Sequence, residues 1–416
     1  MNRRRRRVNW FWVMILIILI GAGVYMDAVI IPTIPPPFQP TPTATRDPES
    51  FVNEAEALFE QGKLLQAIEA YRNAIRSNPN DSSSYVALAR VQVFSGQYEE
   101  AQNSAEDALL LNPNNSMAHA ARAWALDFQG DYLAAEAAIK RALELDPNNA
   151  MAHAYYSEIL VDSFLSGSGP FDSIELAAEA SRVALSLAPN TIETHRARAY
   201  VLEATGNYEE AITEYQAAIN INENISDLHL SLGRNYRALG VYDKAVEEFT
   251  RANALNPSDP TPDLLISRTY ATVGEYAKAA QYGEQAIKDN PIDANLHGNL
   301  GVMYYQNFQW PEALQELSLA VYGGAIGEDS VIEPLILGNN ARIAEYYFTY
   351  AIVLARLNRC GEALQISQMI LGTIPSNELA VFNANEAIFL CEENLTSPPT
   401  ATPVPPVKDT VATPGS

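Results

Sequence analysis

Apolar positions in the middle of the chain have the spacing of two helices separated by a turn. The stretch that begins at Ser226 has apolar or aromatic residues three, four and seven positions apart, first up to Tyr236 and then up to Ala252. Such spacing places these residues on one face of a helix. Gly240 lies between the two runs, where it favours a helix end, and Pro257 follows the second run, where it prevents a longer helix. The pattern predicts a pair of amphipathic helices.

This two-helix pattern recurs along most of the chain. Pro79, Pro113 and Pro147 are 34 residues apart, and so are Pro257 and Pro291. Alanines recur in register with these prolines, and their small side chains let paired helices approach closely. One series of alanines falls at Ala67, Ala101, Ala135, Ala177, Ala211, Ala245, Ala279, Ala313 and Ala363, and a second at Ala74, Ala108, Ala142, Ala184, Ala218, Ala252, Ala286 and Ala320.

These residues resemble the tetratricopeptide repeat family, whose pattern runs Trp-x2-Leu-Gly-x2-Tyr, then Ala-x3-Phe, then Ala and Pro. The resemblance covers about four-fifths of the chain and implies an all-α fold. We expect a right-handed superhelix, or α-solenoid, of about nine helix-turn-helix repeats over residues 49–395, including a C-terminal capping helix near residues 378–393. Two units carry insertions, at residues 163–172 and 321–342, which are interpreted either as functional loops or as neutral loop drift.

The N-terminal segment, residues 1–31, has the pattern of a membrane anchor. Arg3 to Arg7 precede a run without charge from Trp10 to Met26. A helix over residues 8–31 would rise about 36 Å, enough to cross a bilayer core of about 30 Å. The arginines should stay in the cytoplasm, so the repeat array is expected outside it, in a single-pass arrangement at the cell membrane. A cleaved signal peptide is the alternative, and it gives the array the same location.

Two segments rich in proline and threonine flank the repeats, at residues 32–48 and 396–416. Dense proline disfavours both helix and sheet, so the first segment is expected to be an extended spacer. The second is expected to be a disordered tail or a glycosylated stalk.

Charge and composition exclude several classes of function. Residues 1–31 carry a net charge of +4, and the rest of the chain carries −27. Nucleic-acid binding is not expected, because it needs clustered Lys and Arg side chains. Five histidines, His119, His153, His195, His229 and His297, occupy the fourth place of their repeats, where equivalent residues lie about 10 Å apart, too far for one metal ion. The chain has no recognised catalytic motif, so we expect neither an enzyme nor a cofactor.

The two cysteines are expected to pair outside the cytoplasm, where thiols oxidise. On the repeat pattern, Cys360 begins the second helix of the ninth unit, and Cys391 ends the capping helix. The last turn of that capping helix should stack beside the corner between the two helices of the ninth unit. A disulfide there would tie down the terminal repeat, which has only one neighbour. Two unpaired buried thiols are the alternative.

The resemblance also implies where a partner would bind. In this family the second, fifth, ninth and twelfth places of each first helix face a concave groove. In this chain those places hold a group of arginines and aromatic residues: Arg90, Trp124, Arg196, Tyr200, Arg234, Arg237 and Arg268. Arginine pairs with carboxylates in bidentate fashion, and aromatic side chains supply apolar anchors. The expected partner is a protein or peptide with an acidic segment, unless these arginines only form ion pairs with neighbouring glutamates.

The sequence therefore predicts a membrane-tethered, extracytoplasmic scaffold that binds proteins through its groove. The alternative is an accessory factor of cell-envelope or secretion machinery that binds a polymer or an unfolded client.

Overall fold

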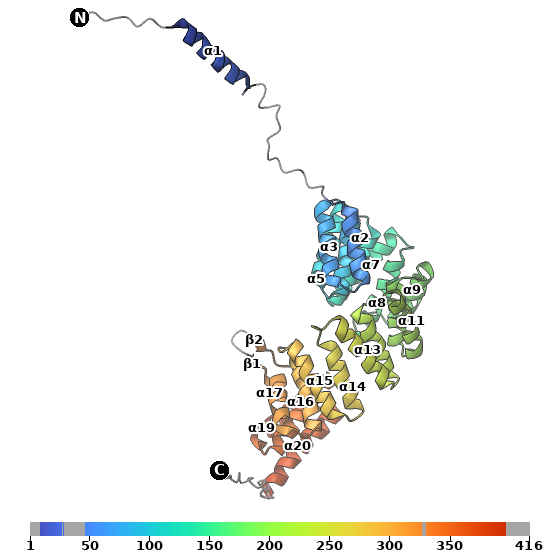
Figure 1. The fold of residues 1–416 in the computed structure, drawn as a ribbon. Coiled ribbons are helices and arrows are strands. Elements are labelled where there is room, and N and C mark those ends of the chain that lie inside the picture. The colour runs from blue at the N-terminus through green and yellow to red at the C-terminus, as the bar shows by residue number, and fades with distance from the viewer. Residues whose placement is uncertain (1–8, 27, 29–45, 327–329, 397–416) are drawn as a thin grey trace, which may run out of the picture.

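The computed structural model describes residues 9–26, 28, 46–326 and 330–396 of the chain (Figure 1). Residues 32–45 of the spacer expected at 32–48 and residues 397–416 of the tail expected at 396–416 therefore lie outside the described residues. Helix α1 covers Trp10–Tyr25, inside the expected anchor, and its apolar side chains are exposed. Among the described residues, no helix combines the length and the apolarity that crossing a membrane requires. Residues 8, 27 and 29–31 of the expected anchor lie outside the described residues.

The remaining helices form nine consecutive pairs and one final helix, within residues 46–396 as described (Figure 1). The first helices of the pairs are α2 (Pro48–Glu60), α4 (Ser82–Phe94), α6 (Ser116–Phe128), α8 (Ala150–Leu165), α10 (Ile192–Ala204), α12 (Ser226–Ala238), α14 (Thr261–Thr272), α16 (Ala294–Gln306) and α18 (Ala341–Arg356). The second helices are α3 (Leu64–Ser77), α5 (Tyr98–Leu111), α7 (Tyr132–Leu145), α9 (Ser173–Leu187), α11 (Tyr208–Ile221), α13 (Tyr242–Leu255), α15 (Tyr276–Asp289), α17 (Trp310–Tyr322) and α19 (Cys360–Thr373). Helix α20 (Glu378–Thr396) closes the array. The all-α repeat fold predicted from the sequence is confirmed.

The turn within each pair depends on a residue after the first helix whose backbone adopts the left-handed conformation, with a positive φ. Glycine takes this place in the first seven pairs, for example Gly62 with φ of +71° and Gly240 with φ of +75°. Phe308 and Asn358 take it in the last two pairs, with φ of 61° and 59°. The alanine series fills the contact between paired helices, since residues such as Ala142 and Ala252 are completely buried.

The two insertions take different forms. In the fourth pair α8 is longer than most of the first helices, and a loop at residues 166–172 leads to α9. After the eighth pair, strands β1 (Gly324–Ile326) and β2 (Ser330–Ile332) form a two-stranded antiparallel hairpin. Gly323 has a positive φ of 68°, and a Cβ atom there would meet the carbonyl oxygen of Ile332 at 2.3 Å. The sequence did not predict this hairpin, because its strands have only three residues each and no alternating pattern.

The first repeat touches the junction between the fifth and sixth repeats, so the N-terminal part of the array closes on itself. The side chain of Asn222 donates to the carbonyl of Phe59, and that of Asn224 donates to the carbonyl of Glu60. A single hydrophobic core holds Phe59 and Leu88 together with Leu202 and the following helices. We call residues 48–225 the closed turn. The array beyond it, from α12 to α20, continues as a simple stack (Figure 1).

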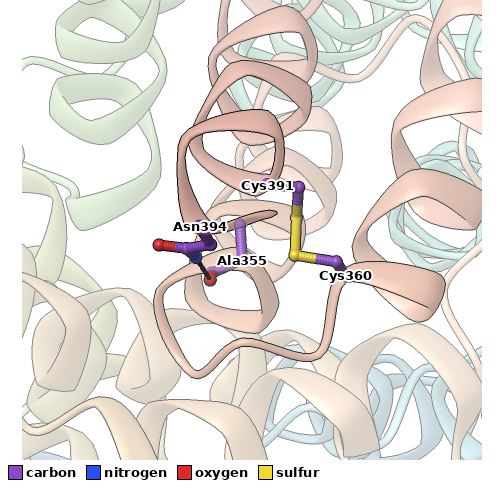
Figure 2. The surroundings of a disulfide bond; sticks show 4 residues. All are labelled: Ala355, Cys360, Cys391 and Asn394. Atoms are coloured by element: carbon purple, nitrogen blue, oxygen red, sulfur yellow. Dashed lines mark hydrogen bonds between the residues drawn. A yellow bond between two sulfur atoms is a disulfide. The ribbon is translucent and has the colours of Figure 1, made fainter. Parts of the chain in front are cut away.

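The C-terminal end is tied by a disulfide between Cys360 and Cys391, whose Cα atoms are 5.5 Å apart (Figure 2). The side-chain amide of Asn394 donates to the carbonyl of Ala355 at 3.0 Å beside it (Figure 2). The disulfide links the start of α19 to α20, and the hydrogen bond links α20 to the end of α18. The last helix is therefore held to both helices of the ninth repeat.

Candidate functional site

The interior of the closed turn is lined by first helices, and its arginines are paired with buried acids. Arg90 on α4 forms an ion pair with Glu193 on α10, whose side chain is 1% exposed. The Arg90 guanidinium also lies 4.7 Å from the centre of the Phe59 ring. Beside this pair is a cavity of about 540 Å³ with mostly apolar walls, including Val86, Met151 and other residues of α4, α6, α8 and α10. Arg90 is thus engaged inside the protein.

Arg196 on α10 lies between two carboxylates. Its Nη1 is 2.6 Å from Oε2 of Glu158, and its Nε is 3.0 Å from Oδ2 of Asp227. Burial raises the pKa of Glu158 to about 7, although Arg196 and the Trp124 hydrogen bond favour its charged form. The Arg196 side chain is only 12% exposed, so it is engaged within the protein.

Trp124, which was expected to be an aromatic anchor, is buried and only 1% exposed. Its ring stacks on Tyr155 with the ring centres 4.3 Å apart, and its Nε1 donates to Glu158 Oε2 at 2.8 Å. Trp124 is therefore part of the core of the closed turn. The sequence rule gave the correct face of the helix, but it did not show that neighbouring helices cover that face.

Tyr200 and Arg234 also make internal contacts. The Tyr200 hydroxyl donates to Oδ1 of Asp162, and the Nε of Arg234 is 3.3 Å from Oε1 of Glu203. Arg234 also donates to the Ser231 hydroxyl at 2.9 Å. Of the seven groove residues expected from the sequence, five are thus engaged within the protein, which agrees with the alternative of internal ion pairs.

Arg237 and Arg268 lie outside this network, on α12 and α14. Within the described part of the chain, no carboxylate comes within ion-pair distance of either guanidinium, and the Nε of Arg268 donates to neutral Asn299 at 3.3 Å. Together with Arg342 they line a cavity of about 500 Å³ that also includes Tyr242 and Glu345. We call this the arginine cavity.

The charge in the arginine cavity is not balanced. Glu345 is its one acidic lining residue and is already paired with Arg342 at 2.5 Å, so two guanidinium groups have no counter-charge there. Burial, followed by the charges of Arg268, Arg342 and Arg234, lowers the pKa of Arg237. A lowered arginine pKa marks a place where an added anion would be stabilised.

Sequence reasoning missed Arg342 and the internal acids for different reasons. Arg342 precedes the regular places of the ninth repeat and lies within the insertion. The rule that selects the second, fifth, ninth and twelfth places of each first helix therefore did not select it. The acids do obey the rule: they occupy the second, ninth or twelfth places of their first helices. They are Asp127, Glu158, Glu193, Glu203 and Asp227. Applying the rule to acidic as well as basic residues would have shown that acids line the same groove as the arginines.

The histidines have a structural role. The Nε2 of each lies 2.8–3.0 Å from the carbonyl oxygen six residues earlier, for example that of Pro291 for His297. In three of them Nδ1 also lies 2.6 Å from a glutamate of the second helix, as His297 does from Glu316. Each imidazole thus fastens the turn before its repeat. No group of side chains in the described residues is placed to hold a metal ion.

Comparison with known families agrees with this repeat architecture. Family models described as tetratricopeptide repeat match residues 58–125, 118–149, 192–225, 226–259 and 264–329. Together these matches span more than half of the chain. A search of curated proteins found no match.

Two solved structures illustrate the similarity at the level of the chain trace. A chain from the crystal structure of the APC/C hetero-tetramer Cut9-Hcn1 is 17% identical, with a TM-score of 0.48 over 60% of this chain and 48% of that one. A tetratricopeptide repeat protein from Parabacteroides merdae is also 17% identical, with a TM-score of 0.40 over 62% of this chain and 98% of that one. The aligned part thus spans about half the length of the first of these proteins.

Proposed function

Since the chain belongs to the tetratricopeptide repeat family, whose members bind protein partners, we propose that it is a non-catalytic scaffold that holds an acidic protein segment in its arginine cavity. The observation that carries this proposal is the unbalanced charge of Arg237 and Arg268 beside Arg342. The arginines of the closed turn do not support it, because acidic side chains of the same chain already pair with them. The proposed binding surface is therefore narrower than the groove expected from the sequence.

The chemistry of this cavity fits a carboxylate-bearing segment. Guanidinium groups bind carboxylates through paired, charge-assisted hydrogen bonds. The lining also contains Tyr242, Tyr276 and Met303, which offer apolar contact to the stem of a bound side chain. A peptide with two or more neighbouring acidic residues would satisfy both unpaired arginines at once.

We also propose that the array is tethered to the cell membrane through residues 8–31 and lies outside the cytoplasm. The support is the run of five arginines before a stretch without charge in the sequence. The disulfide between Cys360 and Cys391 also favours an oxidising compartment, since cytosolic thiols are kept reduced. A reporter fused after Ser416 tests the location: activity of an extracytoplasmic reporter supports the proposal, and activity of a cytoplasmic reporter alone overturns it.

Crosslinking in the native membrane tests the scaffold function. A photoreactive residue at position 238, next to Arg237, should attach to an acidic protein, whose identity mass spectrometry then gives. A matched probe at position 141 on the second helix α7, far from the cavity in the array, controls for chance collisions. If both probes capture the same set of proteins, the arginine cavity is not the binding site.

A further inference from the structure

A second cavity, of about 320 Å³, lies between the closed turn and α12 and is rich in acids. Four carboxyl groups line it, from Asp127, Glu158, Asp162 and Asp227, against two guanidinium groups. The guanidinium groups are those of Arg196 and Arg234, which are committed to the ion pairs described above. We call this the acidic cavity. Its charge is opposite to that of the arginine cavity.

Two of its buried oxygens have no hydrogen-bond partner in the part of the chain described. They are Oδ1 of Asp127 and Oε1 of Glu158, on side chains that are 4% and 2% exposed. Buried carboxylate oxygens normally accept hydrogen bonds, because an unpaired buried acceptor keeps the full cost of its desolvation. Burial, followed by the charges of Asp162 and Glu158, also raises the pKa of Asp127 well above its usual range. These two oxygens thus lack a hydrogen-bond donor within the described residues.

The shape of the site favours an organic cation over a metal ion. Among the described residues, no group of acids is placed to hold a metal ion. Four aromatic side chains, Phe128, Tyr132, Tyr200 and Tyr215, form part of the wall and offer cation–π and apolar contact. Phe128 is 39% exposed, so this wall residue also borders solvent. The volume is at the lower end of those of small-molecule sites.

We propose that the acidic cavity binds a primary ammonium group on an alkyl chain. An ammonium has three N–H donors, which match the unpartnered oxygens of Asp127 and Glu158 together with the carboxylate of Asp162. Asp162 is held in place by the Tyr200 hydroxyl, which donates to it. The alkyl stem lies against the aromatic wall and leads out past Phe128. The acidic cavity shares no lining residue with the arginine cavity, so the two proposals can fail separately.

Calorimetric titration of the full chain tests this site with three matched probes. Pentylamine carries the ammonium, pentan-1-ol has the same chain without charge, and tetramethylammonium has charge without an N–H donor. The proposal predicts saturable binding of pentylamine and at least about tenfold weaker binding of the other two, the factor that 1.4 kcal/mol represents. An N-acetylated lysine amide, added as a fourth probe, distinguishes a lysine side chain of a partner from a free amine as the source.

Substitution locates the site. Asp127→Asn keeps the shape and removes the charge, so we expect a loss of affinity for pentylamine of about tenfold or more. Asp107→Asn, at an exposed position on α5, should leave the affinity unchanged. Circular dichroism confirms that both variants fold. Equal binding of pentylamine and pentan-1-ol, unchanged affinity in Asp127→Asn, or no binding of pentylamine to the folded wild type would each overturn the proposal.

Discussion

The side-chain amide of Asn222 donates a hydrogen bond of 3.1 Å to the carbonyl of Phe59, which lies 163 residues earlier in the chain. This contact closes the first turn of the superhelix. The turn encloses Arg90 and Arg196 with the acids Glu193 and Glu158, whereas the arginine cavity lies beyond it. The closure therefore decides which arginines can reach a partner.

Two glycines allow a test of the closure, because both have a positive φ but only one of them lies against another repeat. Gly62 and Gly96 have φ of +71° and +77°. A Cβ atom at Gly62 would lie 2.6 Å from the carbonyl oxygen of Asn224, whereas at Gly96 it would meet nothing within 4 Å. We expect Gly62→Ala to lower the melting temperature more than Gly96→Ala and to increase hydrogen exchange in α2 selectively. Equal effects would show that the contact with Asn224 contributes nothing to stability.

Glu158 makes the stability of the closed turn depend on pH in an unusual direction. Its pKa is about 7 in the folded protein, above the ordinary value of 4.5. Between these values the folded state binds more protons than the unfolded state, so this group makes stability fall as pH rises. The effect is up to about 3 kcal/mol, at 1.36 kcal/mol per pKa unit.

Unfolding in urea at pH 5 and pH 8 measures this effect. We expect Glu158→Gln to reduce the loss of stability between the two pH values, because the amide does not titrate. Glu179→Gln, an exposed position on α9, should keep the loss of the wild type. If Glu158→Gln has the same pH dependence as the wild type, the raised pKa is refuted.

The pKa of His297 should lie above the ordinary histidine value. Burial lowers its pKa, but the hydrogen bond with Glu316 and the one with the Pro291 carbonyl outweigh burial and raise it. The stabilisation from this imidazolium is therefore fully present below pH 6.5 and is lost as pH rises through the raised value. An NMR titration should show the His297 pKa above 6.5, and lower in Glu316→Gln than in the wild type. Glu312→Gln, on the same helix, is the control, and a drop of equal size there would contradict the specific pairing.

The disulfide should stabilise the end of the array locally. Cys360 and Cys391 are separated by 31 residues, for which the loop-entropy account gives about 3–4 kcal/mol. We expect the double variant Cys360→Ser, Cys391→Ser to exchange amide hydrogens faster in α19 and α20, while exchange in α4 is unchanged. Because repeats contact only their neighbours, the effect should fade within a few repeats. A uniform increase along the array would argue against this local role.

The repeated elements of the fold could be predicted from the sequence, because each depends on contacts within one period. The alanine series, the turn glycine and the proline fix the two helices of a unit and their close packing. The closure between Asn222 and Phe59 could not be predicted, since it depends on the small rotation between successive repeats summed over five units. The hairpin of β1 and β2 could not be predicted either, because it lies in an insertion outside the repeated sequence pattern.

The candidate site was predicted only in part for a related reason. The family's rule for the groove-facing places of each first helix identified side chains that face inward, and Arg237 and Arg268 do line a cavity. It does not say which inward residues meet one another across the superhelix, so the pair of Arg90 and Glu193, 103 residues apart, was not apparent. Three histidines did carry a sequence signal that was not used, because each has a glutamate 19 residues later.

Binding of an acidic peptide to the full chain tests the central claim most directly. A fluorescent peptide with a run of six glutamates is titrated with the wild type, with Arg237→Glu and with Arg141→Glu, an exposed position on α7 that has the same charge change. Measured by anisotropy, the affinity should fall by at least about tenfold in Arg237→Glu, as expected for a lost charge-assisted contact, and should fall far less in Arg141→Glu. If the two variants bind the peptide as tightly as each other, the acidic segment is not held in the arginine cavity.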